Sequence, residues 1–238
     1  MRVSPTVRAI VIDIDGTVTD THRRLHPPAI DQLHRLDRRG VPIVIATGNV
    51  LPIALALYRF LGLRGPIVAE NGGLLYERRA DGDHVRRLAD MGVALRAYRA
   101  LARAGLKPRR LFTDRWRESE VGLEDTFDVA RARAVLRRHP VDVVSSGFAI
   151  HLIQRGVGKL STLGRALEPY GLTPSDCMVA GDGENDIPML AAAGWAVSFA
   201  DAHPKARAVA DFVSRRPSGL GLVEALKRAR VLPPNPGS

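Results

Sequence analysis

Two aspartates follow an apolar run near the start of the chain, in the segment 13–17, which reads DIDGT. On an extended backbone, the carboxylates of Asp13 and Asp15 project to the same face. Carboxylates this close repel each other unless a cation joins them or one of them is protonated. The motif therefore indicates a cation site, and the alternative interpretation is a turn rich in Asp and Gly.

A second acidic motif, GDGEND at 181–186, also follows an apolar run. Asp182 and Asp186 are four residues apart, so a turn that leads into a helix can aim both at one point. Taken alone, an aspartate at the position of Asp182 is more often just the N-cap of that helix. Together with Asp13 and Asp15, however, it gives four carboxylates. Ligand sets made only of oxygen favour a hard cation such as magnesium, which keeps waters that a phosphate can displace.

Two further residues have types and positions that suit an anionic ligand. Thr47 stands between a predicted strand and a predicted helix, where a hydroxyl and backbone N–H groups can bind a phosphoryl oxygen. The alternative is that Thr47 or Asn49 only caps the helix. Lys159 is one of four lysines and opens a predicted helix, where a cation opposes the helix dipole. Its presence there, in a chain with so few lysines, indicates that a compact positive charge is needed at this position.

The elements that must position these residues alternate short apolar runs with longer amphipathic segments, which is typical of a parallel sheet with helical crossovers. The predicted strands are 9–12, 42–46, 66–69, 178–180 and 196–199, and the predicted helices are 28–39, 51–61, 159–170, 187–193 and 221–230. Polar motifs at the carboxyl ends of such strands lie where open α/β sheets bind their ligands.

The middle third of the chain has a different order of predicted helices and strands. It contains predicted helices at 91–104 and 128–138 and predicted strands at 111–113, 141–145 and 148–153, which is an α+β pattern. The simplest architecture is an α/β core formed by residues 1–79 and 158–238, with residues 80–157 inserted as a separate α+β domain.

Composition limits the function further. The chain has 238 residues, with 35 basic and 25 acidic side chains and a net charge of +10. This charge suits anionic substrates or nucleic acid, but aromatic residues make up only 5%, too few for a base-stacking surface. The single cysteine, Cys177, excludes a disulfide framework and fits a reducing compartment. Without a signal-peptide pattern or an apolar stretch of roughly 18 residues, we expect a cytoplasmic protein with neither a membrane nor a nucleic acid as partner.

The motifs, in this order, resemble those of the haloacid dehalogenase (HAD) superfamily of phosphohydrolases, in the branch with an α+β cap. Within that branch, the chain is most similar to archaeal-type phosphoglycolate phosphatases. The resemblance spans essentially the whole chain and is carried by DIDGTVT at 13–19, TGN at 47–49, VAENGG at 68–73, SGFAIH at 146–151 and GDGEND at 181–186. Many relatives carry Arg where Asn49 stands, and the Asn form points to this subgroup.

The resemblance implies a HAD-like Rossmannoid core with an inserted cap, and a reaction that passes through an aspartyl-phosphate. Asp13 would be the nucleophile, and Asp15 the general acid and then the base. Thr47 and Lys159 would bind the phosphoryl group of the substrate.

The implied cofactor is magnesium, Mg²⁺, held by Asp13, the backbone carbonyl of Asp15, Asp182 and Asp186. The implied substrate is a small phosphorylated acid, 2-phosphoglycolate. Sugar phosphates or phosphoglycerate-type esters are the alternative substrates, and a basic nucleic-acid-binding protein is a remote alternative. We expect a monomer or homodimer. A substrate contact by His151 stays open beside a structural role.

Overall fold

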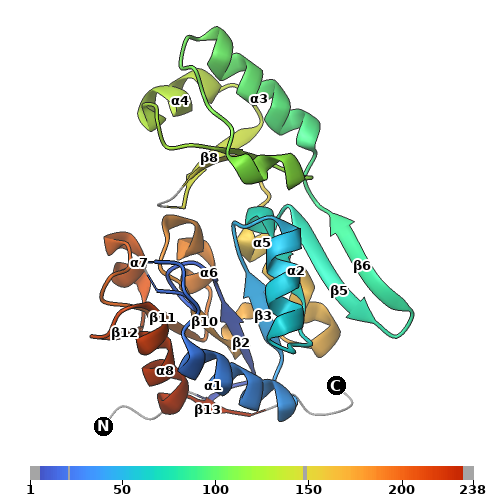
Figure 1. Cartoon of the computed structure of the whole chain (residues 1–238), viewed down its shortest axis with the longest axis vertical. Helices are drawn as coiled ribbons and strands as arrows, with labels where there is room; N and C mark the ends of the chain where they lie inside the picture. The colour runs from blue at the N-terminus through green and yellow to red at the C-terminus, as the bar shows by residue number, and fades with distance from the viewer. Residues whose placement is uncertain (1–5, 21, 147–148, 233–238) are drawn as a thin grey trace.

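The computed structural model of the chain describes residues 6–20, 22–146 and 149–232 (Figure 1). Its centre is an eight-stranded sheet in the order β12–β11–β10–β2–β3–β4–β5–β6. These strands are β12 (Phe212–Val213), β11 (Trp195–Ser198), β10 (Cys177–Ala180), β2 (Ala9–Ile12), β3 (Ile43–Ala46), β4 (Ile67–Ala69), β5 (Leu74–Arg79) and β6 (Gly82–Arg87). The strands from β12 to β4 are parallel, whereas β5 and β6 form an antiparallel hairpin on the edge.

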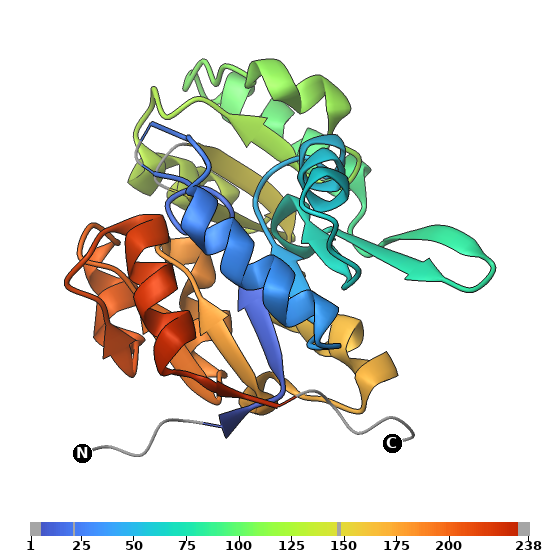
Figure 2. The same cartoon turned by 60° about the horizontal axis from the view of Figure 1, so that its bottom comes forward.

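Helices cover both faces of this sheet, which is why its central strands read as unbroken apolar runs. In β2, Ile10 and Ile12 pack on one face, and Ala9 and Val11 pack on the other. The first face is covered by α1 (Pro27–Arg38), α2 (Leu51–Phe60) and α8 (Ser218–Arg228). The second face is covered by α5 (Lys159–Leu167), α6 (Ile187–Ala191) and α7 (Pro204–Val209). Figure 2 shows α1 and α8 side by side.

A smaller domain lies across one end of the large sheet, at the top of Figure 1. Its antiparallel sheet has the order β7–β9–β8. The strands are β7 (Val121–Leu123), β8 (Val141–Ser145) and β9 (Ile150–Gln154), and the helices are α3 (Met91–Arg103) and α4 (Val129–Leu136). The small domain has an apolar core of its own, in which Leu101, Leu136 and Leu152 are buried.

The two ends of the described chain meet below the large sheet. There β1 (Thr6–Val7) pairs in parallel with β13 (Arg230–Val231). None of the helices in the described ranges is long and apolar enough to cross a membrane.

The predicted strands and helices of the α/β core are confirmed, with ends that differ by at most three residues. One predicted strand, 111–113, is wrong. Residues Phe112–Trp116 form a 3₁₀ turn instead, because the buried Asp114 carboxylate accepts a hydrogen bond from Gly122 N at 2.6 Å. The predicted strand 148–153 corresponds to β9, which begins at Ile150; Phe148 lies outside the described residues.

The hairpin of β5 and β6 was not predicted. β6 has no recognisable hydrophobic strand pattern because most of its residues are charged or polar. Charged residues are common on exposed edge strands. Because β6 belongs to the large sheet, the chain crosses to the small domain only after Arg87, although 80–157 was the predicted inserted range. The division into residues 1–79 and 158–238 against 80–157 stays a prediction.

Candidate active site

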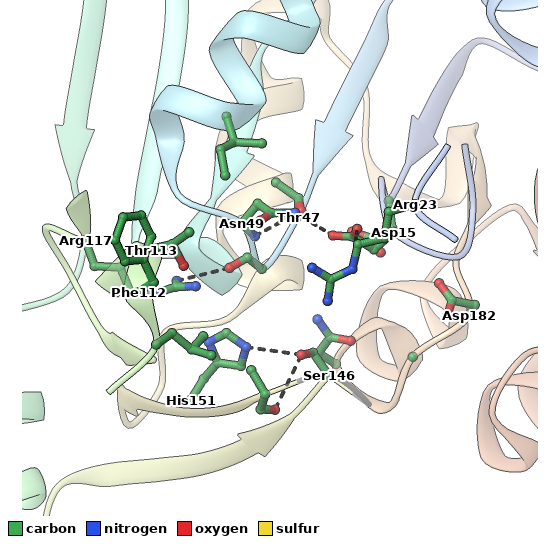
Figure 3. A pocket seen from close by; sticks show the side chains of 17 residues that line it. Asp15, Arg23, Thr47, Asn49, Phe112, Thr113, Arg117, Ser146, His151 and Asp182 are labelled. Atoms are coloured by element: carbon green, nitrogen blue, oxygen red, sulfur yellow. Dashed lines mark hydrogen bonds and ion pairs between the residues drawn. The ribbon is translucent and has the colours of Figure 1, made fainter. Parts of the chain in front are cut away.

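The polar motifs meet at the carboxyl ends of three neighbouring strands. Asp13 directly follows β2, Thr47 follows β3, and Asp182 stands two residues after β10. A pocket of about 260 Å³ lies between this edge and the small domain. Its floor includes Asp13, Asp15, Thr47, Asn49 and Asp182, and its roof includes Arg117, Ser146 and His151 (Figure 3).

Three carboxylates form an acidic cluster at the floor. One oxygen each of Asp13, Asp182 and Asp186 lies within 4.8 Å of the others. Burial and the neighbouring carboxylates raise the pKa of Asp13 to about 7 and that of Asp182 to about 8. Buried charges of one sign need a compensating cation. The all-oxygen donor set fits a hard cation such as magnesium.

Lys159 supplies a permanent positive charge beside this cluster. Its Nζ lies 3.0 Å from Asp13 Oδ1 and 2.6 Å from Asp186 Oδ1, and its side chain is 1% exposed. Burial disfavours the ammonium form, but the two carboxylates outweigh that effect and raise the pKa of Lys159. The start of α5 is held in place by Thr162, whose hydroxyl donates to Gly72 O at 2.7 Å.

Asp186 uses both carboxylate oxygens within the protein. Oδ1 accepts from Lys159, and Oδ2 accepts from the backbone N–H groups of Asp182 and Gly183 at 3.0 and 2.9 Å. It therefore shapes the loop that presents Asp182. The hydroxyl of Thr17 donates to Asp182 Oδ1 at 3.2 Å, so Asp182 does not act as the helix cap considered from the sequence.

Asp15 lies apart from the acidic cluster, and its side chain is 25% exposed. Its Oδ2 accepts from Asn49 Nδ2 at 2.5 Å, and Arg23 Nε is 4.0 Å from its Oδ1. The residue that precedes α2 as its cap is Val50, so the side chain of Asn49 holds Asp15 and does not cap the helix. Thr47 is buried, and its Oγ1 accepts from Asn49 N at 3.0 Å.

The roof comes from the small domain, and sequence reasoning identified only part of it. Figure 3 shows His151 and Ser146 on the opposite side of the pocket from Asp15, Thr47 and Asn49, and Arg117 at one side, next to Phe112 and Thr113. Arg117 belonged to no motif, yet its Nη1 donates to Gly48 O at 3.0 Å and contacts the buried Glu120. Only the run SGFAIH signalled His151 in the sequence.

The roof segment is fastened directly to the edge of the large sheet. Glu70, which is fully buried, accepts hydrogen bonds from Glu118 N, from Ser119 N at 2.9 Å and from Ser119 Oγ at 2.5 Å. Asn71 donates from Nδ2 to Glu120 Oε2 at 3.0 Å. The segment 117–120, which brings Arg117 to the pocket, is therefore fixed to the large sheet.

Comparisons with known proteins agree with this arrangement. A family model of haloacid dehalogenase-like hydrolases matches residues 10–89 and 128–226. The phosphoglycolate phosphatase of Methanothermobacter thermautotrophicus is 41% identical over 93% of this chain and 98% of its own length. That of Methanoculleus marisnigri is 36% identical over 93% and 96%. The crystal structure of Thermoplasma acidophilum 0175 has a TM-score of 0.84 and 30% identity, covering 93% of this chain and 97% of that one.

Proposed function

The chain belongs to the haloacid dehalogenase-like hydrolase family, and from this premise we propose that it is a magnesium-dependent phosphatase that hydrolyses 2-phosphoglycolate to glycolate and phosphate. The observation that carries the proposal is the placement of two aspartates at one pocket. Asp13 is buried beside Lys159 and the acidic cluster, while Asp15 is partly exposed and held by Asn49. The surroundings of Asp13 suit a nucleophile, and those of Asp15 suit a group that exchanges protons with solvent.

In the first step, a carboxylate oxygen of Asp13 attacks phosphorus as the bond between phosphorus and the glycolate oxygen breaks. Asp15 donates its proton to that oxygen, so that glycolate leaves as the alcohol. Lys159 remains paired with Asp13 and stabilises the negative charge on the transferred phosphoryl group. The hydroxyl and the following backbone N–H groups at Thr47 hold a phosphoryl oxygen.

In the second step, Asp15 accepts a proton from a water molecule, which attacks the phosphorus of the aspartyl-phosphate. Phosphate leaves and the Asp13 carboxylate is restored. Magnesium held by Asp13, the backbone carbonyl of Asp15, Asp182 and Asp186 would neutralise phosphoryl oxygens during both steps. Splitting the hydrolysis in this way divides one high barrier into two lower ones.

Two features support a small acidic substrate. The related archaeal proteins carry the name phosphoglycolate phosphatase, and the pocket, at about 260 Å³, is small for a ligand site. We further propose that the protein acts in the cytoplasm, as a monomer or homodimer.

A substrate panel tests the proposal. We expect kcat/KM for 2-phosphoglycolate to exceed that for glucose 6-phosphate or a nucleotide by roughly 30- to 150-fold, the value of one buried charged hydrogen bond. 3-Phosphoglycerate completes the panel. If glucose 6-phosphate or the nucleotide is the better substrate, the assignment to phosphoglycolate is wrong.

Two controls test the chemistry independently of the substrate, with p-nitrophenyl phosphate as a reporter. Asp13→Asn keeps the shape of the side chain but removes the nucleophile, and should lower kcat at least about 10³-fold. A chelator should abolish activity, magnesium should restore it, and calcium should inhibit because it takes more ligands at longer distances. Full activity in excess chelator would contradict the metal requirement.

A further inference from the structure

We propose that Arg117 and His151 form a subsite in the roof of the pocket that binds the carboxylate of the substrate, and that Glu120 is the residue that positions both. The inference rests on the proposed function, because it assigns the residues that recognise the acid end of a phosphorylated acid. The related proteins are named for their substrate, and nothing in those names says which residues recognise it.

The charges of the pocket set the direction in which such a substrate lies. The floor holds the acidic cluster and Asp15, which would repel a second carboxylate. Once the phosphoryl group occupies the floor, the acid end must point towards the opposite side. His151 lies there, and Arg117 lies at the side of the pocket that is away from Asp182 (Figure 3).

The Arg117 side chain is buried and is held in place by the residues around it. Its side chain is 3% exposed, although it lines the pocket. Nη1 is engaged by Gly48 O and Glu120, while Nε has no hydrogen-bond partner among the described residues and lies 3.8 Å from Asp114 Oδ1. Nε is buried on the side of Gly122 and cannot reach the pocket, so the donors that remain for a carboxylate are the two N–H groups of Nη2.

The fully buried carboxylate of Glu120 contacts both of the side chains that we assign to the subsite. It contacts Arg117, accepts from His151 Nδ1 at 2.9 Å, and accepts from Asn71 Nδ2. The neighbouring His151 and Arg117 side chains and their hydrogen bonds outweigh the effect of burial and lower the pKa of Glu120 to about 2. An ionised carboxylate can only accept hydrogen bonds, so His151 carries a proton on Nδ1. Its Nε2 then lies towards Ser146, 3.2 Å from the hydroxyl oxygen.

Gly122 leaves the space that the Arg117 guanidinium occupies. A Cβ atom on Gly122 would lie 2.6 Å from Nε and 3.2 Å from Cζ of the arginine. The guanidinium can therefore lie where it does only because this strand position has no side chain. Gly122→Ala consequently displaces Arg117 while it keeps every charge in the roof.

The experiment compares 2-phosphoglycolate with its neutral analogue 2-phosphoglycolamide, in which an amide replaces the carboxylate. For Arg117→Gln we expect kcat/KM for phosphoglycolate to fall roughly 30- to 150-fold, mainly through KM, because one charged hydrogen bond is lost. The amide should lose no more than about 3-fold. Glu120→Gln, His151→Gln and Gly122→Ala should shift the ratio of the two substrates in the same direction.

Arg109→Gln is the matched control, because Arg109 is an exposed arginine of the small domain that pairs with Glu124. It should leave the substrate ratio unchanged. Arg23→Gln tests the other arginine that lines the pocket, near Asp15. Should Arg117→Gln fail to fold, Gly122→Ala decides between the outcomes, since it removes no charge.

Equal losses on both substrates would overturn the inference, because they would show a general effect on the pocket. If Arg23→Gln were the only variant to lose the preference for phosphoglycolate over the amide, the inference would also be overturned, because the carboxylate would then bind near Arg23. Either result leaves the proposed function intact. A wild-type enzyme that hydrolyses p-nitrophenyl phosphate but not phosphoglycolate would instead contradict the proposed function, and the carboxylate subsite with it.

Discussion

Asp13 and Asp15 are two residues apart in the sequence but lie in different surroundings. Asp13 is buried against Lys159 and faces two other carboxylates, whereas Asp15 is a quarter exposed and held by an amide. A pair of acids can divide nucleophilic and acid–base work only when their environments differ in this way. Asn49 contributes to this division by fixing Asp15 with a neutral donor.

The first prediction at the residue scale concerns the leaving group. Asp15→Asn should lower kcat for alkyl esters such as phosphoglycolate by about 10²- to 10⁴-fold, because an alkoxide needs a proton to leave. The loss on p-nitrophenyl phosphate should be smaller, since nitrophenolate leaves without one. Steady-state kinetics on both substrates provides the measurement. Equal losses would remove Asp15 from the role of general acid.

The second concerns Glu120 and pH. Its pKa in the folded protein, about 2, lies below the ordinary value of about 4.3. The ionised form is therefore favoured by folding, so its contribution to stability is full above about pH 5 and declines as pH falls towards 2. Urea unfolding at pH 7 should show that Glu120→Gln lowers the free energy of unfolding. This difference should shrink between pH 5 and 3, and a difference that grows there would contradict the ion-pair arrangement.

At the scale of elements, the loop after β2 determines whether the acidic cluster forms. Gly16 adopts a φ of +72°, and a Cβ there would lie 2.3 Å from Asp182 Oδ2. The Asp182 carboxylate thus occupies the space that a side chain at position 16 would need, so only glycine fits there.

Gly16→Ala should therefore weaken the metal site without removing any carboxylate. We expect the magnesium concentration for half-maximal activity to rise at least about tenfold, because a carboxylate displaced by even a fraction of an ångström coordinates poorly. A magnesium titration measures it. Gly82→Ala is the control, since Gly82 also has a positive φ but has nothing within 4 Å of its Cβ position. Identical titration curves for the two variants would contradict the prediction, because they would show that the clash with Asp182 does not weaken the metal site.

The elements also show which features could be predicted from the sequence. Asp13, Thr47 and Asp182 could be placed together because each follows a recognisable apolar strand, and parallel strands bring such ends to one edge. Arg117 and Glu120 could not, because their positions depend on Gly48 and Asn71, which are far away in the sequence. The turn at Phe112–Trp116 could not be predicted for a different reason: it depends on a local side-chain contact, Gly122 N to the Asp114 carboxylate, which hydrophobic periodicity does not show.

For the whole molecule, the net charge of +10 raises the question of nucleic-acid binding. Several arginines of the small domain and its approach pair with nearby acids, as Arg87 does with Glu118, Arg109 with Glu124 and Arg155 with Asp142. Arg155 is thus engaged outside the pocket. Arginines that are paired in this way contribute less to the open basic stripe that a duplex requires.

We therefore expect no saturable binding of a labelled DNA duplex at about 0.15 M salt, up to a protein concentration of about 10 µM. Fluorescence anisotropy measures this directly, with hydrolysis of phosphoglycolate in the same buffer as proof that the protein is active. Saturable binding whose affinity falls steeply with salt would reveal a basic surface that the pairing of the arginines does not neutralise.

The order of strands in the large sheet has a consequence for how the protein is made. β2 lies between β3 and β10, so its second neighbour belongs to the last third of the chain. At about 5–20 residues per second, a ribosome needs on the order of ten seconds to reach β10 after β2 has emerged. Throughout that interval β2 can pair with β3 but keeps an open edge, while the small domain, which has its own core, can already fold. The nascent protein can thus fold the roof of its pocket before the floor is complete, and Asp13 can meet Asp182 only after β10 has been synthesised.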